Sequence, residues 1–444
     1  MPHAPRPANA AVGTAASGPP GVSVRIRMSA CLQSVGWALG LLIALLVLRA
    51  YLLPNTWPVW FDQWRNVNVH YLGLGGARGV GAAAVALATV VFGSYYPIAS
   101  RRDSSFGLWL ITGAWLSLTT VVILAPWSPD AIVLRESGLL LGYVGGLAAA
   151  RLLPRIETYI ASLVGLGALQ STLAIAYRVQ GLDTFVSGTV IRSGGSFGSP
   201  TELSVVAVFI VPLAVCGVLG SSSTVERTYF MFASACLLAA LILTWERSAV
   251  VACLVAVLLL VRKTVPARLQ FAILAAALCL LFVVFYVRSS GPINADSSAR
   301  SVQGRVETMQ ASALAFRHHW FDGVGVGRLS LPVQIEIAGR PARVSLIDPH
   351  NQILFWAAEM GIVGAVLAVA LAWFVYRTLR DAGSPWRDGV AAVWVSVLIA
   401  GMFNTLFGLS GFGCGNMLIG SLLGLTIRLG ALGHETSKAI AAIP

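Results

Sequence analysis

Hydrophobic residues form long, continuous runs along this chain, and short polar stretches separate them. About twelve runs approach the roughly 20 apolar residues that a helix needs to cross a bilayer. They lie at residues 30–53, 76–98, 106–124, 131–150, 157–177, 202–219, 228–245, 248–261, 267–287, 351–376, 388–408 and 411–430. The run 248–261 is short for a span. Because the runs are continuous rather than alternating, they predict membrane helices and not a β-barrel.

Composition agrees with this pattern. The chain is 57% hydrophobic and 11% charged, with a mean hydropathy of +0.79, whereas soluble domains carry about 25% charged residues. We therefore predict an all-α polytopic membrane protein. The net charge of +12 suggests attraction to anionic lipid headgroups, and no aromatic-interleaved basic patch points to nucleic acid. The six cysteines have neither a CxxC motif nor even spacing, so we expect them to form no disulfide and no metal site. We also expect no cofactor.

Basic residues predict the orientation of the chain. They occur in every second loop between the apolar runs. The positive-inside rule places these loops and both termini in the cytoplasm. The predicted order is a disordered N-terminus (1–28), nine membrane helices (29–287), a large outer loop (288–350), three more helices (351–430) and a cytoplasmic tail (431–444).

Arginine also gathers on the opposite, outer face, where the loops contain no lysine. Arg192 and Arg247 lie tight against helix ends, while Arg288 and Arg305 belong to the large loop. The planar guanidinium is suited to bidentate contacts with phosphate. Long outer loops are exempt from the charge rule, which explains arginines at 328–343 better than it explains Arg192 and Arg247. The pattern favours an anion-binding face.

The stretch 347–364, "IDPHNQILFWAAEMGIVG", places a histidine at the start of an apolar run. Asp348 is a suitable N-cap, Pro349 suits the first turn, and His350 and Asn351 are expected to follow in that turn. The positive end of the helix dipole disfavours imidazolium, which would keep His350 neutral and basic. His350 is thus a candidate proton acceptor. A helix cap with an incidental histidine fits the local sequence equally well.

The large outer loop has helical spacing over residues 298–320. Val302, Val306, Met309, Ala313 and Phe316 fall near one stripe, which predicts an amphipathic helix lying on the membrane or over the bundle.

Three further features of the sequence receive structural interpretations. The glycines of 323–327 match neither a dinucleotide nor a Walker motif, and we interpret them as a tight turn. His318 and His319 are adjacent and have no acidic or cysteine partner at ligand spacing, so they do not predict a metal site. We expect Glu359 to pair with another membrane helix.

Several stretches between residues 190 and 370 together resemble the O-antigen ligase and polymerase family of bacterial membrane glycosyltransferases. "DPHNQILFWAAEMGIVG" is similar to the family's His-Asn and Glu-x-Gly stretch, and "GRVETMQASALAFRHHWFDGVGVG" to its periplasmic-loop segment. "LTWERSAVVA" is similar to its Thr-x-Ser-Arg helix end, and "GGSFGSPTELSVVAV" to its Gly-x-Phe-x-Asn-Pro-Asn stretch. Glu246 stands where Ser is usual, and Ser199 and Glu202 replace Asn, so we assign these three no role.

The resemblance implies a GT-C-like fold of about twelve membrane helices with one large periplasmic loop. It implies metal-independent, inverting transfer of a glycan from undecaprenyl pyrophosphate to a sugar hydroxyl of lipid A–core oligosaccharide. This lipopolysaccharide biosynthesis step would take place on the periplasmic face of the bacterial inner membrane. His350 would be the catalytic base, and Arg192, Arg247, Arg305 and Arg288 would bind the pyrophosphate. The implied partners are the lipid-linked donor, the acceptor and membrane lipids, without nucleic acid.

Three alternatives remain open at the level of sequence. An O-antigen polymerase or a protein O-oligosaccharyltransferase would share the donor and the base and would differ in acceptor. A transporter or flippase for an anionic lipid belongs to a different class. Transporters tend to show internal repeats and broken helices that meet near mid-membrane, whereas this chain shows no clear repeat and gathers its polar residues at the outer interface.

Overall fold

The computed structural model describes the placement of residues 77–95, 105–124, 133, 137, 139–147, 156–182, 185–187, 190–197, 199–262, 264–289, 292–325, 332–337, 340–345, 350–382, 384–404, 406 and 414–441. The predicted disordered segment 1–28 and the predicted membrane run 30–53 lie outside these residues.

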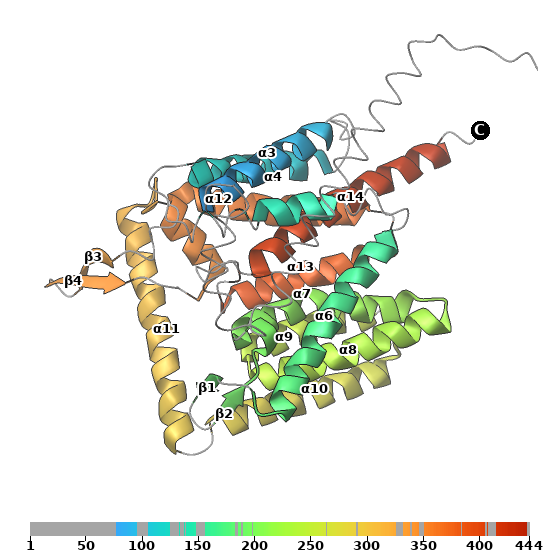
Figure 1. Ribbon diagram of the computed structural model, residues 1–444, viewed down its shortest axis with the longest axis horizontal. Coiled ribbons are helices and arrows are strands. Elements are labelled where there is room, and N and C mark those ends of the chain that lie inside the picture. Colours follow the sequence, from blue (N-terminus) through green and yellow to red (C-terminus); the bar gives the residue numbers. More distant parts are fainter. Residues whose placement is uncertain are drawn as a thin grey trace, which may run out of the picture.

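Helices dominate the described part of the chain (Figure 1). They are α3 (Ala77–Tyr95), α4 (Ser105–Leu124), α6 (Ile156–Val179), α7 (Pro200–Gly220), α8 (Thr224–Thr244), α9 (Arg247–Val261), α10 (Ala267–Ser289), α11 (Pro292–His318), α12 (Gln352–Asp381), α13 (Arg387–Gly401) and α14 (Cys414–Ala441). Residues 139–147 are helical as well. The helical character that the apolar runs predict is therefore confirmed.

Four of these helices are long and apolar enough to cross a membrane: α6, α7, α8 and the 30-residue α12. The apolar parts of α3, α4, α9, α10 and α14 are shorter, at 10–17 residues. The structure thus supports a polytopic helical membrane protein, and the predicted total of about twelve spans stays a prediction.

Two short β-hairpins depart from the predicted all-α fold. Strands β1 (Phe185–Ser187) and β2 (Val190–Arg192) pair antiparallel, with Phe185 opposite Arg192. Strands β3 (Pro332–Ile337) and β4 (Arg340–Ser345) form the second pair. Both hairpins lie between the apolar runs, where backbone groups that a two-stranded sheet leaves unpaired can bond to water rather than face lipid.

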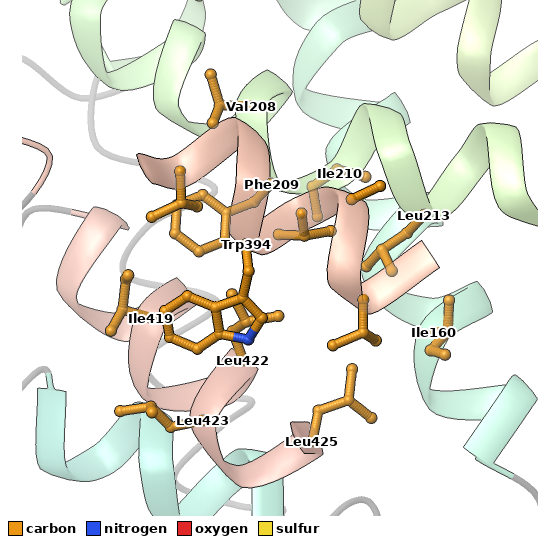
Figure 2. Close-up of a cluster of buried hydrophobic side chains, with 14 of the residues drawn as sticks. Ile160, Val208, Phe209, Ile210, Leu213, Trp394, Ile419, Leu422, Leu423 and Leu425 are labelled. Atoms are coloured by element: carbon orange, nitrogen blue, oxygen red, sulfur yellow. The ribbon is translucent and has the colours of Figure 1, made fainter. Parts of the chain in front are cut away.

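The core is centred on α7, most of whose side chains are buried. Figure 2 shows its Phe209, Ile210 and Leu213 around Trp394 of α13, with α14 residues below. Polar bonds fix the same contact, since Trp394 Nε1 donates to Thr426 Oγ1 at 3.0 Å and Ser396 Oγ donates to the Val208 carbonyl at 2.7 Å. This packing holds the ends of α7 and α13 in fixed positions for the site described below.

Helix α11 crosses one end of the helix bundle, on the side where both hairpins lie (Figure 1). The helix predicted at 298–320 is confirmed at Pro292–His318. Its small residues Ala311 and Ala315 pack against Phe355 and Ala358 of α12, because small side chains permit close approach of two helices. The predicted apolar stripe faces away from this contact: Val302, Val306 and Met309 are 56%, 46% and 37% exposed, respectively.

Helix α12 is broken at Gly361, which has φ 63° and ψ −149°. The turn after α11 fills the break. Val324 N and Gly325 N donate to the carbonyls of Ala358 and Glu359 at 2.9 and 3.0 Å, and Ile362 N donates to the Trp320 carbonyl at 2.7 Å. The span predicted at 351–376 is thus present as α12 but has a break within it, because backbone from the outer loop replaces helical hydrogen bonds at Gly361.

The glycine turn has a direct role in this docking. Gly323 and Gly325 have positive φ angles of 69° and 97°. A Cβ atom on Gly323 would collide with the backbone of Glu359, and one on Gly361 would collide with the backbone of Phe321. These contacts confirm the tight-turn interpretation for the described glycines of 323–327 and explain why glycine is required on both sides.

Candidate functional site

A polar cluster surrounds the turn between α8 and α9. Helix α8 ends at Thr244, Trp245 takes the left-handed conformation with φ 56°, and Glu246 is the N-cap of α9. Arg247 is therefore the first residue of α9. The "TWERS" sequence reverses the chain within two residues, which places one carboxylate and one guanidinium at the same helix end.

Arg192 enters this turn from the end of β2. Its Nε donates to the Thr244 carbonyl at 2.8 Å, and its guanidinium forms an ion pair with Glu246. The next residue, Ser193, donates its backbone N–H to the Leu243 carbonyl at 3.0 Å. Arg192 is only 6% exposed. It thus binds the C-terminal end of α8, where carbonyl groups and the helix dipole favour a cation.

Glu246 is the functional-site residue to which the sequence analysis assigned no role. It is buried, and it accepts a hydrogen bond from Thr201 Oγ1 at 3.3 Å in addition to its ion pair with Arg192. The only signal in the sequence was the acidic residue in the place where the related family usually has serine. The carboxylate balances one guanidinium inside the protein, where an unpaired charge is costly.

Arg247 and Arg305 add two further cations. Arg305 is half-buried on α11, and its charge acts on Arg247 at the start of α9. Partial burial and then the charge of Arg305 lower the pKa of Arg247, and Glu246 opposes this effect. The structure therefore places Arg192, Arg247 and Arg305 near enough for their charges to act on one another, with Glu246 among them. The side chain of Arg288 lies outside the described residues.

The histidine segment has a different local structure from the predicted one. Helix α12 begins at Gln352, and Asn351 is its N-cap, with its side chain accepting from Leu354 N at 2.9 Å. The prediction of Asp348 as N-cap is therefore wrong, because the Asn351 amide takes this place. Asp348 and Pro349 lie outside the described residues. His350 is half-buried and immediately precedes the cap, so it remains beside the positive end of the helix.

Hydrogen bonds connect the histidine segment to the arginine cluster. Asn351 Nδ2 donates to the Met402 carbonyl at 3.2 Å, and Asn404 Nδ2 donates to Ser248 Oγ at 2.7 Å. Residues 402–404, which follow α13, thus link the N-terminus of α12 to that of α9. Thr201 in the first turn of α7 completes the set through its bond to Glu246. Three helix N-termini converge here, and each favours an anion.

Backbone geometry marks the same place. Among the described residues, Trp245 and His350 are the non-glycine residues with positive φ, at 56° and 50°. Side chains with a Cβ atom adopt this conformation at a cost, and such residues cluster at functional sites. One stands beside Arg247 and the other at the N-terminus of α12. We therefore define the candidate active site as Arg192, Glu246, Arg247, Arg305 and His350.

The chemistry available at this site is anion binding and proton transfer. No group of three or more His, Cys, Asp or Glu side chains that could hold a metal ion occurs among the described residues. Metal independence stays a prediction, and it requires its own experiment.

Comparison with known families gives one match. Residues 232–369 match the family model described as O-antigen ligase. This segment contains Glu246, Arg247, Arg305 and His350, together with the Gly323 turn, whereas Arg192 lies before it. A comparison with curated proteins finds no match. The matched segment therefore coincides with the elements that build most of the candidate active site.

Proposed function

We propose, on the match of residues 232–369 to the family model described as O-antigen ligase, that the chain transfers a glycan from undecaprenyl pyrophosphate to a sugar hydroxyl of lipid A–core oligosaccharide. The observation that carries this proposal is the gathering of Arg192, Arg247 and Arg305 at converging helix N-termini, linked by hydrogen bonds to the segment of His350.

The arginines stabilise the leaving group in this proposal. When the bond between the sugar and the pyrophosphate breaks, negative charge builds up on the departing phosphate oxygen. Arg247 and Arg305, both half-buried, contact the pyrophosphate, and Arg192 contributes its charge from its buried position beside Glu246. Arg288 is the fourth expected ligand. Preorganised cations of this kind stabilise the transition state without a metal ion.

His350 acts as the general base. Its imidazole removes the proton from the acceptor hydroxyl while the hydroxyl oxygen attacks the anomeric carbon. A new glycosidic bond forms, the carbon–oxygen bond to the pyrophosphate breaks, and undecaprenyl pyrophosphate leaves with the electron pair. Because this is a single displacement, the anomeric configuration inverts. The reaction takes place on the periplasmic face of the bacterial inner membrane, where both lipid-linked substrates are accessible.

The test is transfer activity of the purified full chain with lipid-linked glycan and lipid A–core oligosaccharide. We expect His350→Ala to lower turnover by about 10²–10⁴-fold, because it removes the proton acceptor. His319→Ala removes an exposed imidazole from the end of the α11 segment and should keep wild-type turnover. Near wild-type turnover in His350→Ala would reject the assigned base. Chelator should leave activity intact, and complete loss would reveal a metal requirement.

The same assay separates the alternative functions through the acceptor. Exclusive extension of a lipid-linked repeat would identify an O-antigen polymerase, and exclusive modification of Ser or Thr in a pilin-like protein would identify a protein O-oligosaccharyltransferase. Transport of a labelled anionic lipid in proteoliposomes, without glycan transfer to any acceptor, would identify a transporter or flippase.

A further inference from the structure

A second candidate site lies in a cavity that runs along α12, from Gln352 at its start to Arg380 near its other end. This cavity of about 670 Å³ separates α4 and α12 from α13 and α14. Its walls are mostly apolar and include Ile111, Trp115, Leu371, Val375, Trp394 and Leu423. The volume is in the range of roughly 300–1,000 Å³ that is usual for small-molecule sites. The cavity is not lined by Arg192, Arg247 or Arg305 of the candidate active site.

The cavity has two chemically different ends. Gly401 lies beside Gln352, so the end of α13 packs against the start of α12. The start of α13 must consequently lie near the end of α12. The first end carries Gln352 and the buried carboxyl group of Glu359, whereas the second end carries Arg262, Arg380 and Arg387.

The second end retains positive charge after its ion pairs are counted. Nε of Arg380 bonds to Asp381 at 3.0 Å, and Nε of Arg387 bonds to Asp388 at 3.0 Å. Each of these bonds uses one of the five N–H groups of a guanidinium, so the remaining donors can bind another acceptor. Arg262 from the end of α9 adds a third guanidinium, which leaves one excess positive charge among the five groups.

Part of the apolar wall is exposed on the surface of the described residues. Val369, Tyr376 and Leu398 line the cavity, yet they are among the exposed large apolar side chains of the described residues. A ligand can therefore enter from the bilayer with an apolar portion against this wall and a polar group at the arginines.

We propose that this cavity binds an anionic phospholipid, with acyl chains along α12 and α13 and its phosphate at Arg262, Arg380 and Arg387. Arginine forks suit a phosphate group, and an apolar wall suits acyl chains. The isoprenoid donor fits less well, because its pyrophosphate is expected at the other arginine cluster and the near end of this cavity carries Glu359. The arginines at the phosphate end of the cavity take no part in the proposed transfer chemistry.

The test measures binding of phosphatidylglycerol to the detergent-purified full chain by native mass spectrometry, with phosphatidylcholine as the zwitterionic comparison. We expect wild type to prefer phosphatidylglycerol. Replacing Arg262, Arg380 and Arg387 together by Gln should weaken phosphatidylglycerol binding on the order of 100-fold, since each arginine near a lipid headgroup contributes several-fold.

The matched control replaces Arg227, Arg268 and Arg377 by Gln. These arginines are exposed and lie near helix termini, and none of them lines the cavity, so the net charge changes equally and binding should stay within about twofold. Ala372→Trp fills the cavity from α12 and should abolish the preference with all arginines present.

Three results would overturn the proposal. The first is equal binding of both phospholipids by wild type, and the second is equal loss of binding in the two triple variants. The third is displacement of phosphatidylglycerol by a polyprenyl phosphate in wild type, together with loss of polyprenyl phosphate binding in Ala372→Trp, which would assign the cavity to the isoprenoid donor. All readouts are lipid binding, so they are unaffected if the proposed transfer reaction is wrong.

Discussion

At the scale of single residues, Glu246 determines how the Arg192 guanidinium is held. The pair is buried, and Arg192 also bonds to the end of α8. A buried ion pair adds little net stability compared with apolar residues of similar size, but removal of one partner leaves the other charge unpaired. Glu246 therefore keeps a cation inside the candidate active site without a bound substrate.

We expect Glu246→Ala to destabilise the protein by about 3–5 kcal/mol, because it leaves Arg192 charged and buried. Thermal unfolding of the purified chain measures this effect. Glu307→Ala, on the exposed face of α11, is the matched control and should change stability by about 0.5 kcal/mol or less. The double variant Arg192→Met with Glu246→Leu should recover most of the loss. If Glu246→Ala unfolds at the same temperature as wild type, the ion pair has no structural role.

At the scale of elements, the break in α12 ties the outer loop to a membrane helix. The turn after α11 bonds to backbone groups on both sides of Gly361. Broken helices are tolerated at membrane depth where other protein groups satisfy the freed backbone bonds. The glycines of the Gly-x-Gly turn and of the Glu-x-Gly stretch serve this single contact, although about 35 residues separate them.

Gly361→Ala should loosen the contact between the turn after α11 and the break in α12. The new methyl group would collide with the Phe321 carbonyl, and a φ angle of 63° is unfavourable for alanine. Hydrogen exchange of the Val324 and Gly325 amides should accelerate at least tenfold, since these N–H groups donate to α12 carbonyls and their bonds open more often. Gly304→Ala on α11 meets no atoms and should instead stabilise its helix by about 1 kcal/mol. Unchanged exchange in Gly361→Ala would contradict the docking described above.

At the scale of the whole molecule, α11 and both hairpins lie at one end of the bundle, and the α12–α13 turn lies at the other end of α12 (Figure 1). The candidate active site and the arginine end of the proposed phospholipid cavity are therefore at opposite ends of α12. Since basic residues remain in the cytoplasm, we expect Arg377 and Arg380 on the cytoplasmic side and α11 on the periplasmic side.

Cysteine labelling measures this orientation. In a chain whose native cysteines are replaced, Arg317→Cys on α11 should react with a membrane-impermeant maleimide added outside spheroplasts. Arg377→Cys on α12 should react only after the membrane is permeabilised. Both side chains are exposed, so the side of the membrane on which each lies decides whether the maleimide reaches it. The reverse pattern would place His350 in the cytoplasm and remove the basis of the proposed reaction.

Much of the fold was predictable from local sequence, and the site was predictable in part. The run 157–177 is helical at Ile156–Val179, because continuous apolar residues require helices in lipid. Arg247 was predictable at a helix end, whereas Arg192 ends β2 and Arg305 lies in the middle of α11, so only packing brings the three together. The cap at Asn351 was missed, because its amide also bonds to Met402, 51 residues along the chain. No local pattern reports such a partner.

By itself, then, the sequence determined that this is a helical membrane protein with an arginine-rich face and a histidine at a helix start. These properties depend on hydropathy and charge, which act locally. Only the tertiary structure decided that Glu246 balances Arg192, that a loop turn fills the break at Gly361, and that α7, α9 and α12 begin at one place. Each of these depends on bonds between residues far apart in the chain, which form only when the helices pack.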